Sequence, residues 1–153
     1  AEADRAAHMW PKVENDTAYR AMARAIWTER FQPRPPMPGA PTPGQVAAKQ
    51  IERAVQAVAK LRARGVQVIF VRHPDGGDYL AFEHRAFPRA TTWDVLLART
   101  GAPGIHFEDH PELGAGLEFP EWSHMSRESA ERYTERLYRL IEREHPLPDA
   151  RHW

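Results

Sequence analysis

Apolar residues recur at helical spacing in three long segments of this chain. The clearest covers residues 45–64, and the others cover residues 15–31 and the stretch that begins at Ser126. In each segment, side chains three or four positions apart form one apolar face, which is typical of an amphipathic helix packed on a core. The same spacing predicts two shorter helices, over residues 78–87 and over a stretch that ends near Gly101.

Short polar residues stand where two of these helices should begin. Asn15 or Asp16 precedes the first helix, and Ser126 precedes the last one. Such side chains accept hydrogen bonds from the free backbone N–H groups of a first helical turn, so we expect them to be N-caps.

Two segments have the composition of buried strands. Residues 66–72, VQVIFVR, are β-branched and apolar on both faces, which predicts a central strand covered on both sides. Residues 104–107, GIHF, predict a second strand. Helix, glycine, strand and loop follow one another as in an α/β domain with parallel strands. Because sheets normally have more than two strands, we expect others, in unpatterned segments or outside this chain.

The length of 153 residues allows a single α/β domain with additional segments at its ends. Six of the 14 prolines lie between Pro33 and Pro43, so a helix cannot continue there and an extended connector is expected. The alternative for this segment is a proline-rich ligand for a partner domain. If His8-Met9 is a cloning junction, residues 1–9 carry no fold information. The predicted division is a tail, a helix, the connector, the α/β domain and a second tail, at residues 1–14, 15–31, 32–44, 45–145 and 146–153.

Composition excludes several classes of protein. The 21 basic and 21 acidic residues cancel, which argues against a nucleic-acid partner. The chain has no cysteine, so disulfides, thiolate nucleophiles and cysteine-ligated metals are excluded. No apolar run approaches the roughly 20 residues needed to span a bilayer. The composition does not indicate a compartment, and we expect no cofactor.

Polar side chains follow both predicted strands and precede the last helix. Ligands of open α/β sheets bind beyond the carboxyl ends of parallel strands. Arg72 and His73 end the first strand, and Asp109 follows the second. Glu121 and His124 lie three apart in the turn before the last helix. There the carboxylate can accept the imidazole Nδ1–H, which leaves Nε2 as a base. The alternative is that His124 packs the turn while Glu121 is solvated.

The segment PEWSHMSRESAERYTERLYRLI resembles the C-terminal block of SGNH/GDSL-type hydrolases, in which an acid and a histidine, as D-x-x-H, precede the final helix. The resemblance covers roughly residues 45–144 and implies a flavodoxin-like three-layer αβα fold with a parallel sheet, here partial and helix-rich. It also implies ester or acyl hydrolysis or transfer, on an ester or acylated small molecule. His124 would be the general base and Glu121 its orienting acid, with glutamate in place of the family's aspartate.

The nucleophile that this resemblance requires is missing. The chain has no G-D-S block, and its only serines are Ser123, Ser126 and Ser129. The family's G-x-N-D block, which supplies oxyanion donors, is also missing. Ser123 is therefore the one hydroxyl near His124 to test. Arg72, His73 and Asp109, at the carboxyl ends of the two strands, are the candidate substrate-binding residues. A second copy of the chain or an N-terminal half would supply what is missing from the site.

Three other functions remain open. One is a non-catalytic binding or oligomerisation module with a degenerate hydrolase fold. Another is a divalent metal site built from His106, Asp109, His110 and either Glu121 or His124, since these residue types suit zinc. The loop HPDGGD can also cradle an anion through backbone N–H groups. The segment RGVQVIFVRH resembles isochorismatase-like hydrolases, but these need a cysteine nucleophile that the chain lacks.

Overall fold

The computed structural model describes residues 9–33, 35 and 37–146. The first eight residues and the predicted C-terminal tail from residue 147 onward lie outside this range. Helices make up most of the described chain, and short 3-10 turns η1 and η2 interrupt it. In chain order the elements are α1 (Pro11–Asn15), α2 (Thr17–Arg30), α3 (Pro43–Arg62), β1 (Phe70–Arg72), α4 (Gly77–Ala86), η1 (Arg89–Thr91), α5 (Trp93–Thr100), β2 (Gly104–His106), η2 (Phe107–Asp109), α6 (Pro111–Gly114) and α7 (Arg127–Glu144).

The predicted caps explain where the long helices begin. The Asp16 side chain accepts hydrogen bonds from two backbone N–H groups at the start of α2. Ser126 accepts one from Ser129 at the start of α7. Thr42 and Gln45 form a capping box that starts α3 two residues earlier than the apolar pattern indicated. The region predicted as an N-terminal tail contains α1, a helix of five residues.

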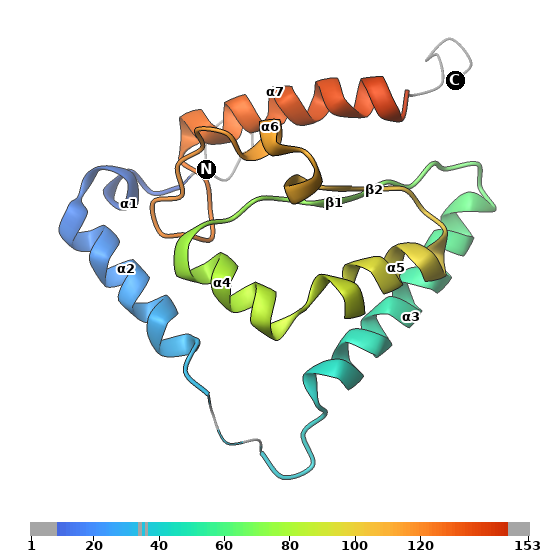
Figure 1. Cartoon of the computed structure of the whole chain (residues 1–153), viewed down its shortest axis with the longest axis horizontal. Coiled ribbons are helices and arrows are strands. Elements are labelled where there is room, and N and C mark those ends of the chain that lie inside the picture. The colour runs from blue at the N-terminus through green and yellow to red at the C-terminus, as the bar shows by residue number, and fades with distance from the viewer. Residues whose placement is uncertain (1–8, 34, 36, 147–153) are drawn as a thin grey trace.

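The sheet consists of β1 and β2, which pair in parallel with Val71 opposite Ile105. Side chains of β2 alternate between its two faces. Ile105 is fully buried in the core that α7 covers, together with Leu113 and Leu140. Gly104 faces α5, where a β-carbon would come within 2.7 Å of Trp93. Figure 1 accordingly places α7 on one side of the strand pair and α3, α4 and α5 on the other.

The predicted strand over residues 66–72 is wrong in its extent and its environment. Only Phe70–Arg72 forms a ladder, because β2 offers just three residues as partners. Within the described residues β1 has one neighbouring strand, so it is not a central strand, and its side chains are half-buried. Val66 is 38% exposed. The fold is therefore a helix-rich α/β arrangement around one parallel strand pair.

An aromatic cluster attaches α2 to α4, although the proline-rich connector and α3 separate these helices in the sequence. The Trp27 and Tyr79 rings meet edge to face, with centroids 4.9 Å apart, and the Phe31 and Phe82 rings stack at 4.5 Å. This packing brings Trp27 to the turn before α7, where the candidate site lies. No helix of the described chain is long and apolar enough to cross a membrane.

Candidate functional site

The turn between α6 and α7 is held by the loop that follows β1. Trp122 has a left-handed backbone, with φ 75°, and its carbonyl accepts a hydrogen bond of 2.9 Å from the Gly76 N–H. Its ring lies so close to Gly77 that a β-carbon there would be 2.5 Å from the indole. Gly77 also has a positive φ of 53°, so glycine is required on both grounds. The two glycines of HPDGGD therefore position the EWSH turn.

Glu121 and His124 make the contact that their spacing predicted. The Nδ1 atom of His124 lies 2.7 Å from Oε1 of Glu121. Glu121 is 8% exposed, whereas 74% of the His124 side chain is accessible. The Trp27 indole N–H donates to Oε2 of Glu121 at 2.5 Å. A buried carboxylate thus orients an exposed imidazole and leaves Nε2 directed away from it.

Ser123 lies on the wrong side of His124 to be activated by it. Its hydroxyl donates to both oxygens of Glu121, at 2.9 and 2.8 Å, and lies 2.8 Å from Nδ1 of His124. A general base would take a proton through Nε2, which has no partner among the described residues. In this geometry Ser123 is a further hydrogen-bond donor to the Glu121 carboxylate.

A cavity of about 780 Å³ lies beside this turn. Its polar lining includes Glu121, Ser123 and His124, together with His73 from the loop after β1 and Tyr133 from α7. The rest of the lining is mainly apolar and includes Val13, Met125 and Ala130. The cavity can therefore hold a small molecule with an apolar portion against an imidazole base.

His73 and Tyr133 form a second hydrogen-bonded pair in this cavity. Nδ1 of His73 lies 2.7 Å from the Tyr133 hydroxyl, and the two rings meet edge to face. Burial, with the positive charge of Arg72 as a smaller cause, lowers the pKa of His73. Burial also raises the pKa of Tyr133 to about 12. Both groups are therefore neutral near pH 7.

The other two predicted substrate-binding residues lie elsewhere. Arg72 forms ion pairs with Asp75, at 2.9 Å, and with Glu83, and it lines a different cavity of about 490 Å³. Asp109 binds both of its oxygens to the guanidinium of Arg89, at 2.7 Å each, and lines neither cavity. The predicted substrate-binding set is therefore divided, and His73 alone accompanies His124.

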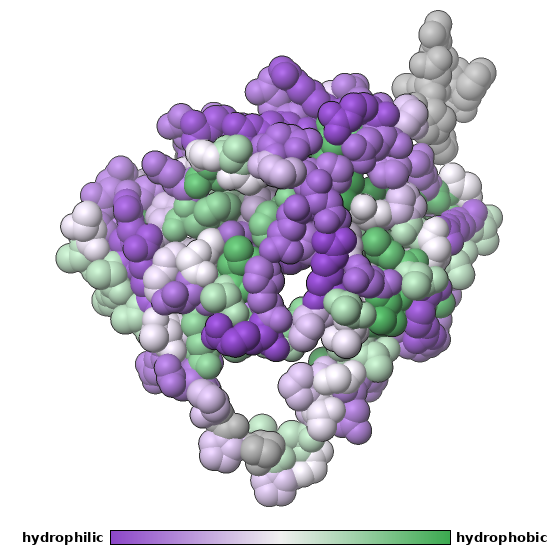
Figure 2. Space-filling model, in the orientation of Figure 1, coloured by the Kyte–Doolittle hydropathy of each residue, from purple (hydrophilic) through white to green (hydrophobic). Residues whose placement is uncertain are grey.

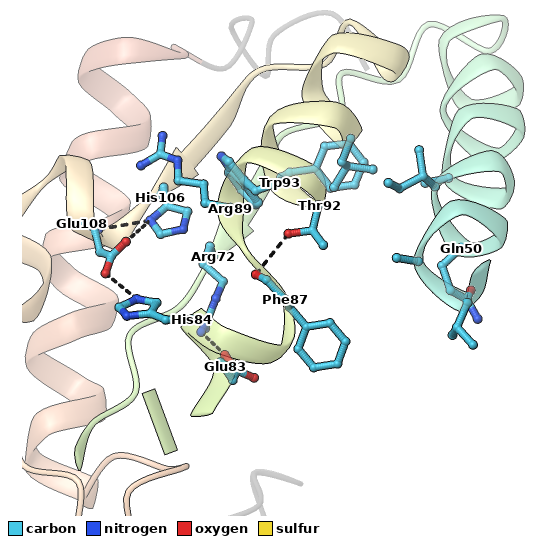
Figure 3. Close-up of a pocket in the computed structure, with 16 residues that line it drawn as sticks. Gln50, Arg72, Glu83, His84, Phe87, Arg89, Thr92, Trp93, His106 and Glu108 are labelled. Carbon is cyan, nitrogen blue, oxygen red and sulfur yellow. Dashed lines mark hydrogen bonds and ion pairs between the residues drawn. The ribbon is translucent and has the colours of Figure 1, made fainter. Parts of the chain in front are cut away.

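Figure 3 shows this second cavity, which lies between α3 and the segment from β1 to η2. One wall is apolar and includes Ile51 and Trp93. The other carries charged groups that already have partners, such as His84, whose Nε2 lies 2.8 Å from Glu108. His106 accepts the backbone N–H of Glu108 at its Nδ1. The charged groups of this cavity are therefore paired, and none of them is a residue of the EWSH turn.

The residues of the alternative metal site are not brought together. Across the described chain, no three histidine, aspartate or glutamate side chains are placed to hold a metal ion. Asp109 is bound to Arg89, and His110 lies 3.9 Å from Glu112 and 4.0 Å from Glu144. Glu121 and His124, the alternatives for the last ligand, are hydrogen-bonded to each other within the turn.

The sequence did not identify two residues that shape the site. Trp27 and Tyr133 stand on the apolar faces of their helices, where a core position is the expected one. Their polar tips, the indole N–H and the phenol, fix Glu121 and His73. In the sequence, the one indication of such a role was a polar atom on a side chain at a core position. This indication does not say which residue the polar atom binds.

Comparison with known proteins adds no relative. No family model, no curated protein and no solved structure matches this chain.

Proposed function

We propose that this chain carries the acid–histidine half of an SGNH-like acyl hydrolase or acyltransferase, with His124 as its general base and Glu121 as the acid that orients it. The observation that supports the proposal is the 2.7 Å contact between Glu121 and Nδ1 of His124 at the edge of a cavity. Nε2 of His124 takes a proton from an attacking hydroxyl group, whose oxygen bonds to the acyl carbon. The proton then passes to the departing alcohol.

Water is the attacking group for the chain on its own, because its three serines do not meet Nε2 of His124. Ser123 is bound to Glu121, Ser126 caps α7, and Ser129 is fully buried. A hydroxyl from a second copy or another segment replaces water where the sheet is completed. On this proposal the β1–β2 pair belongs to a larger flavodoxin-like, three-layer sheet.

Ester hydrolysis by the purified chain tests this function. We expect saturable turnover of 4-nitrophenyl acetate, reduced about 100-fold or more in His124→Ala, since general bases typically contribute about 10²–10⁴-fold. His84→Ala is the matched control, because His84 is also exposed but lines the other cavity. Turnover that is not saturable, or that both variants reduce equally, comes from unspecific imidazole chemistry and overturns the proposal.

The second candidate function is a non-catalytic binding or oligomerisation module. Two observations favour it: no nucleophile of the described chain reaches Nε2 of His124, and the sheet has two strands. A wild-type chain that is folded, associates in solution and has no saturable esterase activity is the expected result for this function.

A further inference from the structure

The His73–Tyr133 pair lines the candidate site but is not used by the proposed base. His73 follows β1, and Tyr133 lies on α7, the helix that covers the face of the strand pair opposite α3, α4 and α5 (Figure 1). Tyr133 is 5% exposed, so little of its side chain reaches bulk solvent. Its contact with Nδ1 of His73, at 2.7 Å, is the hydrogen bond that must satisfy it.

The direction of this hydrogen bond follows from what each group can donate. A phenol has one hydrogen, and Nδ1 of His73 is the only acceptor near it in the described chain. If Nδ1–H donated instead, the phenolic hydrogen would be buried without a partner, which is unfavourable. Tyr133 therefore donates, Nδ1 accepts, and the neutral imidazole carries its hydrogen on Nε2.

Burial, assisted by a neighbouring positive charge, favours the neutral form of the ring. Burial and the adjacent Arg72 both lower the pKa of His73. Ion pairs with Asp75 and Glu83 hold the Arg72 side chain in place. His73 therefore has a fixed tautomer near pH 7, with an N–H donor on the ring edge opposite Tyr133.

Two imidazoles with opposite hydrogen-bonding roles thus line one cavity. His124 uses Nδ1 towards Glu121 and presents an acceptor, Nε2, whereas His73 uses Nδ1 as an acceptor and presents a donor. An acyl group needs both, because its carbon is attacked by a deprotonated hydroxyl while its oxygen gains negative charge. This complementarity is what connects His73 with the reaction.

We propose that Nε2–H of His73 donates a hydrogen bond to the carbonyl oxygen of an acylated ligand in this cavity, and that Tyr133 fixes the required tautomer. His73 then supplies an oxyanion donor, a function for which the chain contains no recognisable motif. The proposal rests on the function proposed above. The ligand is an ester or amide whose carbonyl carries a small apolar substituent, which suits the lining by Val13, Met125 and Ala130.

The tautomer is tested without any reference to activity. Long-range ¹H–¹⁵N spectra of the full chain at pH 7 should assign the hydrogen of His73 to Nε2, and Tyr133→Phe should remove that preference. Titration with N-methylacetamide, an unreactive carbonyl compound, should shift the His73 Nε2 signal in the wild-type chain. A hydrogen on Nδ1, a cationic ring, or no shift on titration overturns the proposal, even if His124 proves to be a base.

The kinetics of His73 variants distinguish a role of His73 in binding the carbonyl oxygen from a role in supporting the fold. His73→Leu should lower kcat for 4-nitrophenyl acetate about 100-fold with little change in KM, as loss of an oxyanion donor typically does. His73→Gln, whose amide N–H can replace the donor, should recover at least part of kcat. Equal loss in both variants, with folding intact by circular dichroism, indicates a structural role and contradicts the proposal. If the wild-type chain shows no turnover, only the proposed hydrolase function is contradicted. The proposal for His73 is then decided by the tautomer measurement.

Discussion

At the scale of single residues, the site depends on Glu121. Its carboxylate accepts hydrogen bonds from the Trp27 indole, the Ser123 hydroxyl and the His124 ring, although the residue is buried. Buried carboxylates are tolerated when such donors surround them. Three donors from two distant parts of the chain therefore hold one acid in place and orient the histidine beside it.

Ser123→Ala distinguishes a nucleophile from a ligand of Glu121. Because Trp27 and His124 still bind the carboxylate, we expect esterase activity to fall less than tenfold. The free energy of unfolding should fall by about 0.5–1.5 kcal/mol, the usual value of one hydrogen bond. Urea denaturation and 4-nitrophenyl acetate turnover measure the two effects. Activity as low as that of His124→Ala would mean that Ser123 is the nucleophile after all.

At the scale of elements, the sequence predicted helices better than strands. Helix ends are determined locally, so Asp16 and Ser126 were sufficient to locate the starts of α2 and α7. A strand needs a partner, and no local pattern in residues 66–72 says how much of it pairs. The site follows the same rule. Glu121 and His124 lie within one turn and were predicted together, whereas the partners Trp27 and Tyr133 are distant in the sequence.

The ion cluster of Arg72, Asp75 and Glu83 joins β1, the loop after it and α4. Asp75 is buried, and its Oδ1 has no hydrogen-bond partner in the described chain. Burial, together with the nearby Asp75, raises the pKa of Glu83 despite the attraction of Arg72. A proton on Glu83 relieves its repulsion with the carboxylate of Asp75, which is why the nearby Asp75 raises the pKa of Glu83.

The raised pKa of Glu83 has a consequence for stability. A carboxyl group that holds its proton more tightly in the folded chain stabilises it below the unfolded pKa, about 4.3 for glutamate. That contribution is lost as pH rises through the higher folded value. Glu83→Gln keeps the hydrogen-bonding shape without the charge, so its stability relative to wild type should increase between pH 4 and pH 7. Urea denaturation at several pH values measures this difference, and parallel curves would contradict it.

At the scale of the whole molecule, the described chain has a small core for its length. The fully buried large side chains are few and lie between β2, α6 and α7. Figure 2 shows apolar residues at the surface on both sides of the central elements. Val46 is 42% and Phe87 49% exposed, and both line the cavity of about 490 Å³. An apolar surface of this kind normally contacts another protein segment.

We therefore expect the isolated chain to associate in solution. Sedimentation equilibrium should give a mass above the 17.5 kDa of one chain, with association that weakens when apolar surface is removed. Phe87→Ser should reduce association, because Phe87 lines the cavity beside the strand pair. Met37→Ser is the matched control: Met37 is 76% exposed but lies in the proline-rich connector, so it should have no effect. A wild-type monomer that binds no hydrophobic dye would mean that the two-stranded sheet needs no further covering.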